Sequence, residues 1–400
     1  MRSFPFIYLI LFVILYFIVA LAAMKSIKKV IASKHYGFVR IMIMFVHLAV
    51  ITCFILFYLF PRKPGSDPGY HIYSCFNAIL FIIFIVNIPL SVSLILNYIF
   101  QDRNNIIPRM GLIISTGIGL AMIYGTLFGA KDININHIDL HFDDLPREFH
   151  NYKIIQISDI HFGNSGYSEK IIEKTNKKLE DIDCDLLLFT GDLVNNFSGE
   201  LDGFVSDFRE FTAGKQCYSV LGNHDYGNYT KWESKEKKQK NFNEILSYNK
   251  QLGFNLLRNE HIVIKKQKDS IFLIGTENWG HPPFPRYADL DAAMLNIPPE
   301  AFTILMTHDP AHWESKVKDK KDIDLTLSGH SHGLQWGIKP AGITFSLAYL
   351  TVCHWGGLYY NEKRILYVNT GLGTVGVPWR IDMPAEITIF ILKRGKIDGK

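Results

Sequence analysis

The sequence has few cysteines, and they do not form a recognisable metal or disulfide framework. No two of the five, Cys53, Cys75, Cys184, Cys217 and Cys353, make a C-x-x-C pair. This excludes a zinc-finger pattern and gives no sign of a disulfide scaffold. The chain also lacks a concentrated basic stripe, and its formal net charge of +4 is small for 400 residues. We therefore expect no nucleic-acid partner.

Charged residues are missing from four long stretches in the first third of the chain. Residues 5–24, 41–60, 72–100 and 110–130 contain no Asp, Glu, Lys or Arg. Each is about as long as a helix must be to cross the core of a bilayer. Four such runs are rare in soluble folds, and the first exceeds the apolar part of a signal peptide. We predict a region of four transmembrane helices over residues 1–130, rather than buried core helices or a cleaved leader.

The basic residues between these runs predict the orientation in the cell membrane. Seven Lys and Arg lie around the first and third loops, against five on the other side. Basic residues in short loops favour the cytoplasmic side. The first loop is therefore expected in the cytoplasm. After four spans, the rest of the chain would lie on the extracytoplasmic side of a multi-pass membrane protein.

The pattern changes after residue 150. Residues 131–150 are predicted to be a linker, and residues 151–400 a second unit, since 400 residues exceed one ordinary domain. Short apolar runs typical of buried strands follow one another, with a helix expected at 168–182. The alternation predicts a layered α/β domain. The expected strands are 153–158, 185–190, 217–221, 271–275, 302–307, 324–328, 365–369 and 386–392.

Polar side chains follow five of these strands. In α/β sheets, ligands bind at the carboxyl ends of strands, so these side chains are expected at one edge. Any one of them alone would be an ordinary capping or turn residue. Together, with Gly191, Gly222 and Gly329 beside three of them, they indicate a site. The candidates are Asp159, His161, Asp192, Asn223, His224, His308, His330 and His332.

The order of these motifs resembles a known signature. D-x-H, G-D, G-N-H-D, H and G-H-x-H, within residues 150–393, resemble the calcineurin-like metallophosphoesterase superfamily. The stretch 368–392 is similar to its bacterial membrane-associated branch. The resemblance implies a four-layer α/β/β/α sandwich with two divalent metal ions, which would be Mn, Fe or Zn. Carboxylates and imidazoles suit such ions.

The resemblance also implies roles for the candidate residues. Asp192 would bridge the two metals, and His224 would face the substrate and protonate the leaving oxygen. Independently of the resemblance, two roles are open for Asp225: it orients His224, or it caps a local turn. The remaining ligands would be Asp159, His161 and His332 at the first metal, and Asn223, His308 and His330 at the second.

The implied function is a membrane-anchored hydrolase of phosphomonoesters or diesters that uses attack by a metal-bound hydroxide. Its substrate would be lipid-linked or part of the cell envelope. Two alternatives stay open: a UDP-diacylglucosamine-type lipid pyrophosphatase at the cytoplasmic face, and a non-catalytic membrane sensor with a vestigial site. Relatives commonly have G-H-S-H-G-G-Q where this chain has Leu334 in place of the second glycine after the histidines. Leu334 is expected to narrow the pocket beside His332. The oligomeric state is left open.

Overall fold

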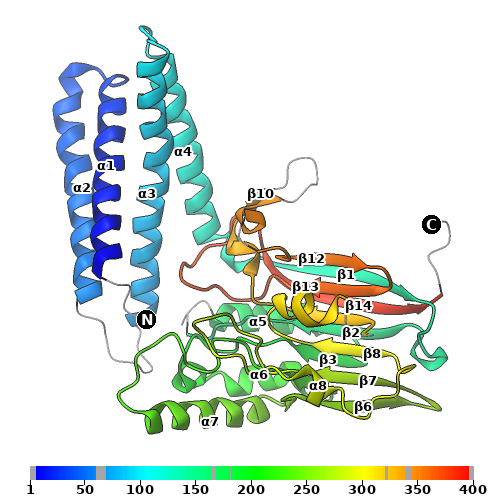
Figure 1. Ribbon diagram of the computed structural model, residues 1–400. Helices are drawn as coiled ribbons and strands as arrows, with labels where there is room; N and C mark the ends of the chain where they lie inside the picture. Colours follow the sequence, from blue (N-terminus) through cyan, green and yellow to red (C-terminus); the bar gives the residue numbers. More distant parts are fainter. Residues whose placement is uncertain are drawn as a thin grey trace. The chain divides into compact units, whose positions relative to one another are not determined.

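The computed structural model describes residues 6–59, 69–163, 168–180, 182–319, 323–338, 345–350 and 352–395. The chain divides into two compact units (Figure 1). The first contains Met1–Phe128 together with the distant segment Gly376–Ile381. The second contains Gly129–Val375 and Asp382–Lys400. A short piece of the C-terminal sequence is therefore part of the helical unit.

The first unit is built on four long helices. They are α1 (Phe6–Lys28), α2 (Ser33–Leu59), α3 (Gly69–Ile99) and α4 (Ile106–Leu127). All four are long and apolar enough to cross a membrane. They confirm the four helices predicted from the sequence.

Small and polar residues lie between these helices, where water could not satisfy a buried polar group. The hydroxyl oxygens of Ser26 and Ser93 are 2.8 Å apart, so α1 and α3 share a hydrogen bond. A Cβ atom at Gly111 would lie 2.4 Å from the Ser93 hydroxyl oxygen, so glycine is what allows α4 to approach α3 there. Contacts of this kind are typical of helices that pack in a membrane.

The second unit contains two six-stranded mixed sheets. The first has the order β1, β14, β2, β3, β4, β5, and the second has the order β12, β13, β9, β8, β7, β6. The strands of the first sheet are Ile133–Phe142, Ala385–Arg394, Tyr152–Ile157, Leu186–Phe189, Cys217–Ser219 and Asn255–Leu256 in that order. Those of the second are Gly357–Asn361, Arg364–Val368, Leu325–Ser328, Thr303–Met306, Asp269–Gly275 and Glu260–Lys266.

The two sheets pack face to face. Successive strand residues point to opposite faces, so β2 buries Ile154 against the second sheet and Ile155 against helices. Helices α5 (Ser168–Leu179), α6 (Val205–Thr212) and α7 (Lys235–Gln251) cover the outer face of the first sheet. Helix α8 (Leu290–Ala293) and the turn Trp313–Val317 cover the second sheet. These layers confirm the α/β/β/α sandwich.

The structure contradicts the predicted linker at residues 131–150. Ile133–Phe142 form β1, which pairs in parallel with β14 along its whole length. Leu140 and Phe142 are buried in the core between the sheets. An edge strand exposes part of its surface, so Asn and His alternate with the apolar residues and the run reads as polar. The second unit therefore begins before residue 150.

Candidate metal centre

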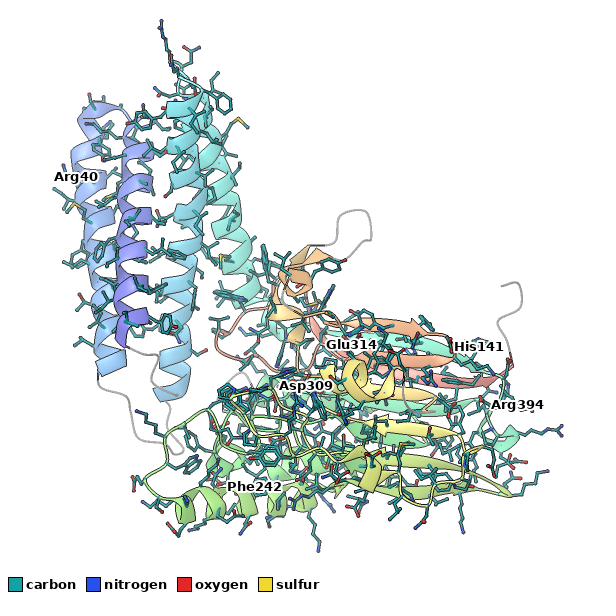
Figure 2. The ribbon with its side chains drawn as sticks, viewed as in Figure 1. Arg40, His141, Phe242, Asp309, Glu314 and Arg394 are labelled. Carbon is teal, nitrogen blue, oxygen red and sulfur yellow. The ribbon has the colours of Figure 1, made fainter. Side chains whose placement is uncertain are left out.

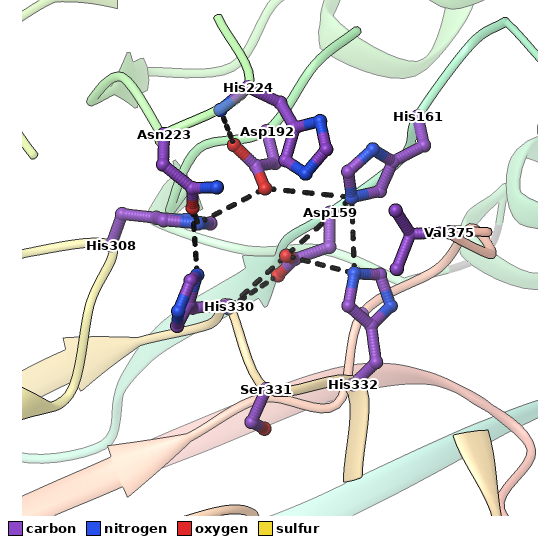
Figure 3. Close-up of polar contacts among 12 residues, drawn as sticks. Asp159, His161, Asp192, Asn223, His224, His308, His330, Ser331, His332 and Val375 are labelled. Atoms are coloured by element: carbon purple, nitrogen blue, oxygen red, sulfur yellow. Dashed lines mark hydrogen bonds and ion pairs between the residues drawn. The ribbon is translucent and has the colours of Figure 1, made fainter. Parts of the chain in front are cut away.

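Five strand ends bring together all eight side chains that the sequence nominated (Figure 3). Parallel strands β2, β3 and β4 lie side by side in the first sheet, and parallel strands β8 and β9 are neighbours in the second. Their carboxyl ends face the same region, as expected for α/β sheets. Asp159 and His161 follow β2, Asp192 follows β3, Asn223 and His224 follow β4, His308 follows β8, and His330 and His332 follow β9.

One group of ligand atoms comes from the loops after β2 and β9. Asp159, His161 and His332 each offer an atom within 4.8 Å of the others. The Nε2 atom of His332 lies 3.3 Å from Asp159 Oδ1 and 3.1 Å from the Nε2 atom of His161. All three side chains are buried. The group has the size and the donors of a site for one divalent cation.

A second group of possible ligands, Asn223, His308 and His330, lies beside the first. Asp192 is close to both groups. Asp192 Oδ2 is 3.2 Å from His308 Nε2 and 3.6 Å from His161 Nε2. Asn223 Oδ1 lies 3.0 Å from His308 Nε2 and 2.7 Å from His330 Nδ1. One oxygen of Asp192, Oδ2, therefore faces both groups, while Oδ1 accepts the backbone N–H of His224.

The donor atoms fit a cation. The Nδ1 atom of His308 is 2.8 Å from the carbonyl oxygen of Thr190, which accepts only, so Nδ1 carries the proton. In a neutral His308, the Nε2 lone pair would then face two acceptors, Asn223 Oδ1 and Asp192 Oδ2. Three acceptors at such distances repel one another unless a positive charge lies between them. A divalent cation supplies that charge and leaves each group in its usual ligand form.

The pKa values of the buried groups also indicate that this centre favours a positive charge. Burial lowers the pKa of His308, but the Asp192 and Asp159 carboxylates and the Thr190 carbonyl together raise it to about 10. Burial raises the pKa of Asp192, yet His308 and His224 hold it well below its ordinary value. Burial also keeps the pKa of His161 well below its ordinary value. Asp192 is thus ionised, and without a metal a proton on His308 balances it.

The backbone at the site is held in an unusual conformation. A left-handed φ is uncommon outside glycine and is maintained only where the surroundings impose it. The clustering of such residues at one place marks a functional site rather than an ordinary set of turns. Five of the seven residues nominated as ligands have this conformation: Asp159 at 53°, His161 at 52°, Asp192 at 60°, His330 at 73° and His332 at 51°.

Two of the motif glycines are needed because the chain passes very close to the ligands. A Cβ atom at Gly222 would lie 2.1 Å from Asp192 Oδ1, and one at Gly329 would lie 2.3 Å from Asp159 Oδ2. Both carboxylates would have to move to admit any other residue. The close approach allows backbone N–H groups to reach the ligands, and those of His224 and His330 donate to Asp192 and Asp159.

His224 lies at the edge of the centre with its imidazole fixed from one side. Its Nδ1 atom donates to the carbonyl oxygen of Asn195 at 2.7 Å, which leaves Nε2 for the site. The interpretation of Asp225 as its orienting partner is wrong. The Asp225 carboxylate instead accepts backbone N–H bonds from Gly222, Asp192 and Leu193, and so holds two ligand loops together.

Leu334 has a strained backbone conformation, which could not be predicted from the sequence. It is 45% exposed and has a left-handed φ of 52°, a conformation that favours glycine. The short turn η5 (His332–Gln335) carries both His332 and Leu334. Replacement of glycine by leucine therefore stores backbone strain two residues from a nominated ligand. The expected narrowing of the pocket stays a prediction.

Some residues around the centre had no signal in the sequence. Tyr229 accepts a hydrogen bond from Asn223 Nδ2 at 2.6 Å, and the backbone carbonyls of Thr190 and Asn195 fix two imidazoles. The aromatic segment 277–287 brings His281 Nε2 to 3.2 Å from Asp309 Oδ2. Asp309, the residue after His308, is labelled in Figure 2. These contacts come from loops whose paths no periodicity predicts.

The paired sheets and the Asp/His cluster at their strand ends define a metallophosphoesterase-type domain. Residues 152–334 match the family described as calcineurin-like phosphoesterase. Phosphoesterases of this family are metal-dependent hydrolases.

Relatives of the chain include membrane proteins. An uncharacterized metallophosphoesterase of Campylobacter jejuni is 27% identical and covers 93% of this chain and 94% of its own length. A transmembrane protein with metallophosphoesterase domain from Danio rerio is 26% identical over 68% of this chain and 60% of its own length. The UDP-2,3-diacylglucosamine pyrophosphatase LpxG of Chlamydia muridarum is 28% identical over 57% of this chain and 81% of its own length. The helices and these relatives together suggest a membrane protein.

Proposed function

We propose that this chain is a membrane-anchored phosphoesterase that hydrolyses a phosphomonoester or diester with two divalent metal ions. The observation that carries the proposal is the position of Asp192, whose carboxylate is shared between two groups of imidazole and carboxylate ligands. Asp159, His161 and His332 would hold one ion, Asn223, His308 and His330 the other, and Asp192 both. The ions would be Mn, Fe or Zn, all of which accept this donor set.

Two divalent cations at such a centre would polarise a phosphoryl oxygen and lower the pKa of a water molecule. The chain's own part begins with the buried ligands, which are held by backbone N–H groups before substrate arrives. Because these donors and dipoles are already oriented, the site needs little reorganisation during the reaction. This preorganisation favours catalysis over a vestigial binding site.

His224 would act as the general acid. Its Nδ1–H bond to Asn195 O directs Nε2 toward the centre. In this proposal, the oxygen of the water molecule bonds to phosphorus while the ester bond breaks. The Nε2 proton of His224 then passes to the departing ester oxygen, and the imidazole is left neutral. Imidazole is suited to this transfer near neutral pH.

The physiological substrate is proposed to be a lipid-linked or envelope phosphate ester on the extracytoplasmic side. The four apolar helices support an anchored enzyme that meets substrates at a membrane. A second candidate is a lipid pyrophosphatase at the cytoplasmic face, and the similarity to the chlamydial UDP-2,3-diacylglucosamine pyrophosphatase favours it. The two candidates differ in substrate and in the side of the membrane.

A substrate panel tests the proposal. Full-length protein in detergent is stripped of metal, reloaded separately with Mn²⁺, Zn²⁺ or Fe²⁺, and assayed on aryl phosphomonoesters, aryl phosphodiesters and UDP-diacylglucosamine. We expect metal-dependent hydrolysis of a simple ester. Preference for the nucleotide-linked lipid would select the second candidate. Absence of turnover with every metal and ester, in folded protein that binds metal, would contradict both.

A further inference from the structure

Tyr229 contacts two functional residues at once. Its hydroxyl oxygen accepts a hydrogen bond from Asn223 Nδ2 at 2.6 Å. Its ring stacks on the imidazole of His224, with ring centres 4.2 Å apart and an angle of 15° between the planes. We infer that Tyr229 is a positioning residue that sets the orientation of a metal ligand through its hydroxyl group and of the general acid through its ring. The inference rests on the function proposed above.

The contact of the Tyr229 hydroxyl group with Asn223 matters because the side-chain amide of Asn223 has an oxygen at one end and an NH₂ group at the other. Only the oxygen of Asn223 can bind a cation, whereas its NH₂ group is a donor. Rotation of the amide by half a turn would place the NH₂ group between His308 and His330. The Tyr229 hydroxyl group accepts from Nδ2 and so holds the far end of the amide in place while Oδ1 faces the two imidazoles. Partners of this kind, beyond the ligands themselves, commonly tune metal affinity.

The ring contact matters because the imidazole of His224 has a single hydrogen bond to the described residues. The Nδ1–H bond to Asn195 O holds one atom of the imidazole, and rotation about that bond would swing Nε2 away. The edge of His161 lies on one side, with ring centres 4.8 Å apart and planes at 88°. The Tyr229 face provides a broad, nearly parallel contact. The rings of His161 and Tyr229 together hold the His224 imidazole in the orientation that directs Nε2 into the site.

Tyr229 is itself held by two neighbouring loops. Its backbone N–H donates to Asn196 Oδ1 at 3.2 Å, and the ring of Phe284 packs against it with centres 4.8 Å apart. The phenol is half-buried. Fixed on these sides, the ring has little freedom to follow a displaced imidazole, as a positioning role requires.

Two substitutions separate the two contacts. Tyr229→Phe removes the hydroxyl group and keeps the ring, whereas Tyr229→Leu removes both. Tyr226→Phe is the matched control, because Tyr226 is a buried tyrosine of the same loop whose hydroxyl group contacts Glu277 and Asn278 instead of a ligand. Each full-length variant is purified in detergent, and its fold is checked by thermal unfolding without metal.

Mn²⁺ binding, measured by calorimetry, tests the hydroxyl contact without any substrate. We expect Tyr229→Phe and Tyr229→Leu to bind Mn²⁺ about 10-fold more weakly than the wild type, and Tyr226→Phe to bind it equally well. Equal affinity in Tyr229→Phe and the wild type would overturn this half of the inference. The measurement holds even if the protein hydrolyses no ester, so a failure of the proposed function is recognised separately.

The leaving group tests the ring contact. At saturating Mn²⁺, a p-nitrophenyl diester needs little protonation of its leaving oxygen, while an alkyl diester depends on it. We expect Tyr229→Leu to lower kcat for the alkyl ester about 10-fold more than for the aryl ester, and Tyr229→Phe to keep the wild-type ratio. An equal fall for both esters would overturn the ring's role. Should Tyr229→Leu not fold, Tyr229→Met takes its place, because it keeps apolar bulk without a flat ring.

Discussion

At the scale of single residues, the proposed centre depends on one carboxylate more than on any other group. Asp192 lies near both groups of ligands, accepts the backbone N–H of His224, and is buried. Replacement of Asp192 by Asn keeps the shape and removes the negative charge. We expect loss of most bound metal and a fall in phosphoesterase activity of at least about 100-fold, since each cation would lose a charged ligand.

The measurement combines metal content, determined by mass spectrometry, with kcat on an aryl diester. Asp207→Asn is the matched control, because Asp207 is an exposed residue of α6 whose carboxylate accepts a hydrogen bond from Ser206. Two tightly held metal ions and near-normal turnover in Asp192→Asn would refute the ligand assignment. Loss of metal in both variants would indicate a general loss of fold.

A buried histidine outside the proposed ligand set predicts an acid sensitivity. His312 is buried, stacks on Trp279 at 4.7 Å, and has no partner for Nε2 among the described residues. Burial lowers its pKa to about 4, against an ordinary value of 6.5. Its neutral form is favoured in the folded state, so stability is present above pH 6.5 and is lost as the pH falls toward 4.

The size of this effect follows from the shift in pKa. A difference of this size corresponds to about 3 kcal/mol of unfolding free energy between pH 6.5 and 4. His312→Phe keeps a flat ring against Trp279 and has nothing to protonate. We expect the wild type to lose about 3 kcal/mol more than this variant, measured by denaturant unfolding of metal-free protein at both pH values. Identical losses would show that His312 does not titrate as proposed.

At the scale of an element, the turn η5 carries strain that a glycine would relieve. Leu334 in a left-handed conformation costs about 1–2 kcal/mol, of which the greater freedom of glycine in the unfolded chain offsets a part. We expect Leu334→Gly to raise the thermal midpoint by a few degrees. Leu295→Gly is the control, because Leu295 is exposed and is not among the residues with positive φ. A lower midpoint in Leu334→Gly than in Leu295→Gly would contradict the argument.

Strand β1 decides where a catalytic fragment must begin. A chain that starts at Asn151 loses β1 and the buried side chains of Phe142, Leu145 and Phe149. It also leaves one edge of β14 unpaired, which invites aggregation. We expect a fragment that starts at Ala130 to be soluble and one that starts at Asn151 to aggregate or unfold at a much lower temperature.

Size-exclusion chromatography and thermal unfolding compare the two fragments. Both retain Gly376–Ile381 and both lack the four helices, so the effect of separating that segment from its unit is common to both. A soluble Asn151 fragment with the same thermal midpoint as the longer one would show that β1 adds little. This comparison revises the boundary that the sequence predicted.

The contrast between β1 and the site shows which parts of the structure sequence patterns can predict. Strands β2, β3, β8 and β9 were predictable because strands buried on both faces are continuous apolar runs. Their following polar residues were predictable because glycines and ligand types mark strand ends. Strand β1 was missed because an edge strand mixes polar and apolar residues. The roles of Tyr229 and Asp225 were not predictable, because each depends on how two loops lie against each other.

At the scale of the whole molecule, the open question is which side of the membrane carries the centre. Five basic residues around the first loop favour its retention in the cytoplasm, because Lys and Arg resist translocation. They are Lys25, Lys28, Lys29, Lys34 and Arg40. If all four helices span the membrane, the following domain is predicted to lie on the extracytoplasmic side. The difference of seven against five basic residues is modest, so the prediction calls for a direct measurement.

Reporters fused after Lys400 make that measurement. We expect alkaline phosphatase to be active and green fluorescent protein to be dark, because the first folds in an oxidising space and the second in the cytoplasm. A matched pair of fusions in the first loop, after Ser33, should give the opposite result. Fluorescence at Lys400 would place the centre in the cytoplasm, where nucleotide-linked lipid precursors would be expected. That outcome would overturn the predicted topology and favour the lipid pyrophosphatase over the envelope phosphoesterase.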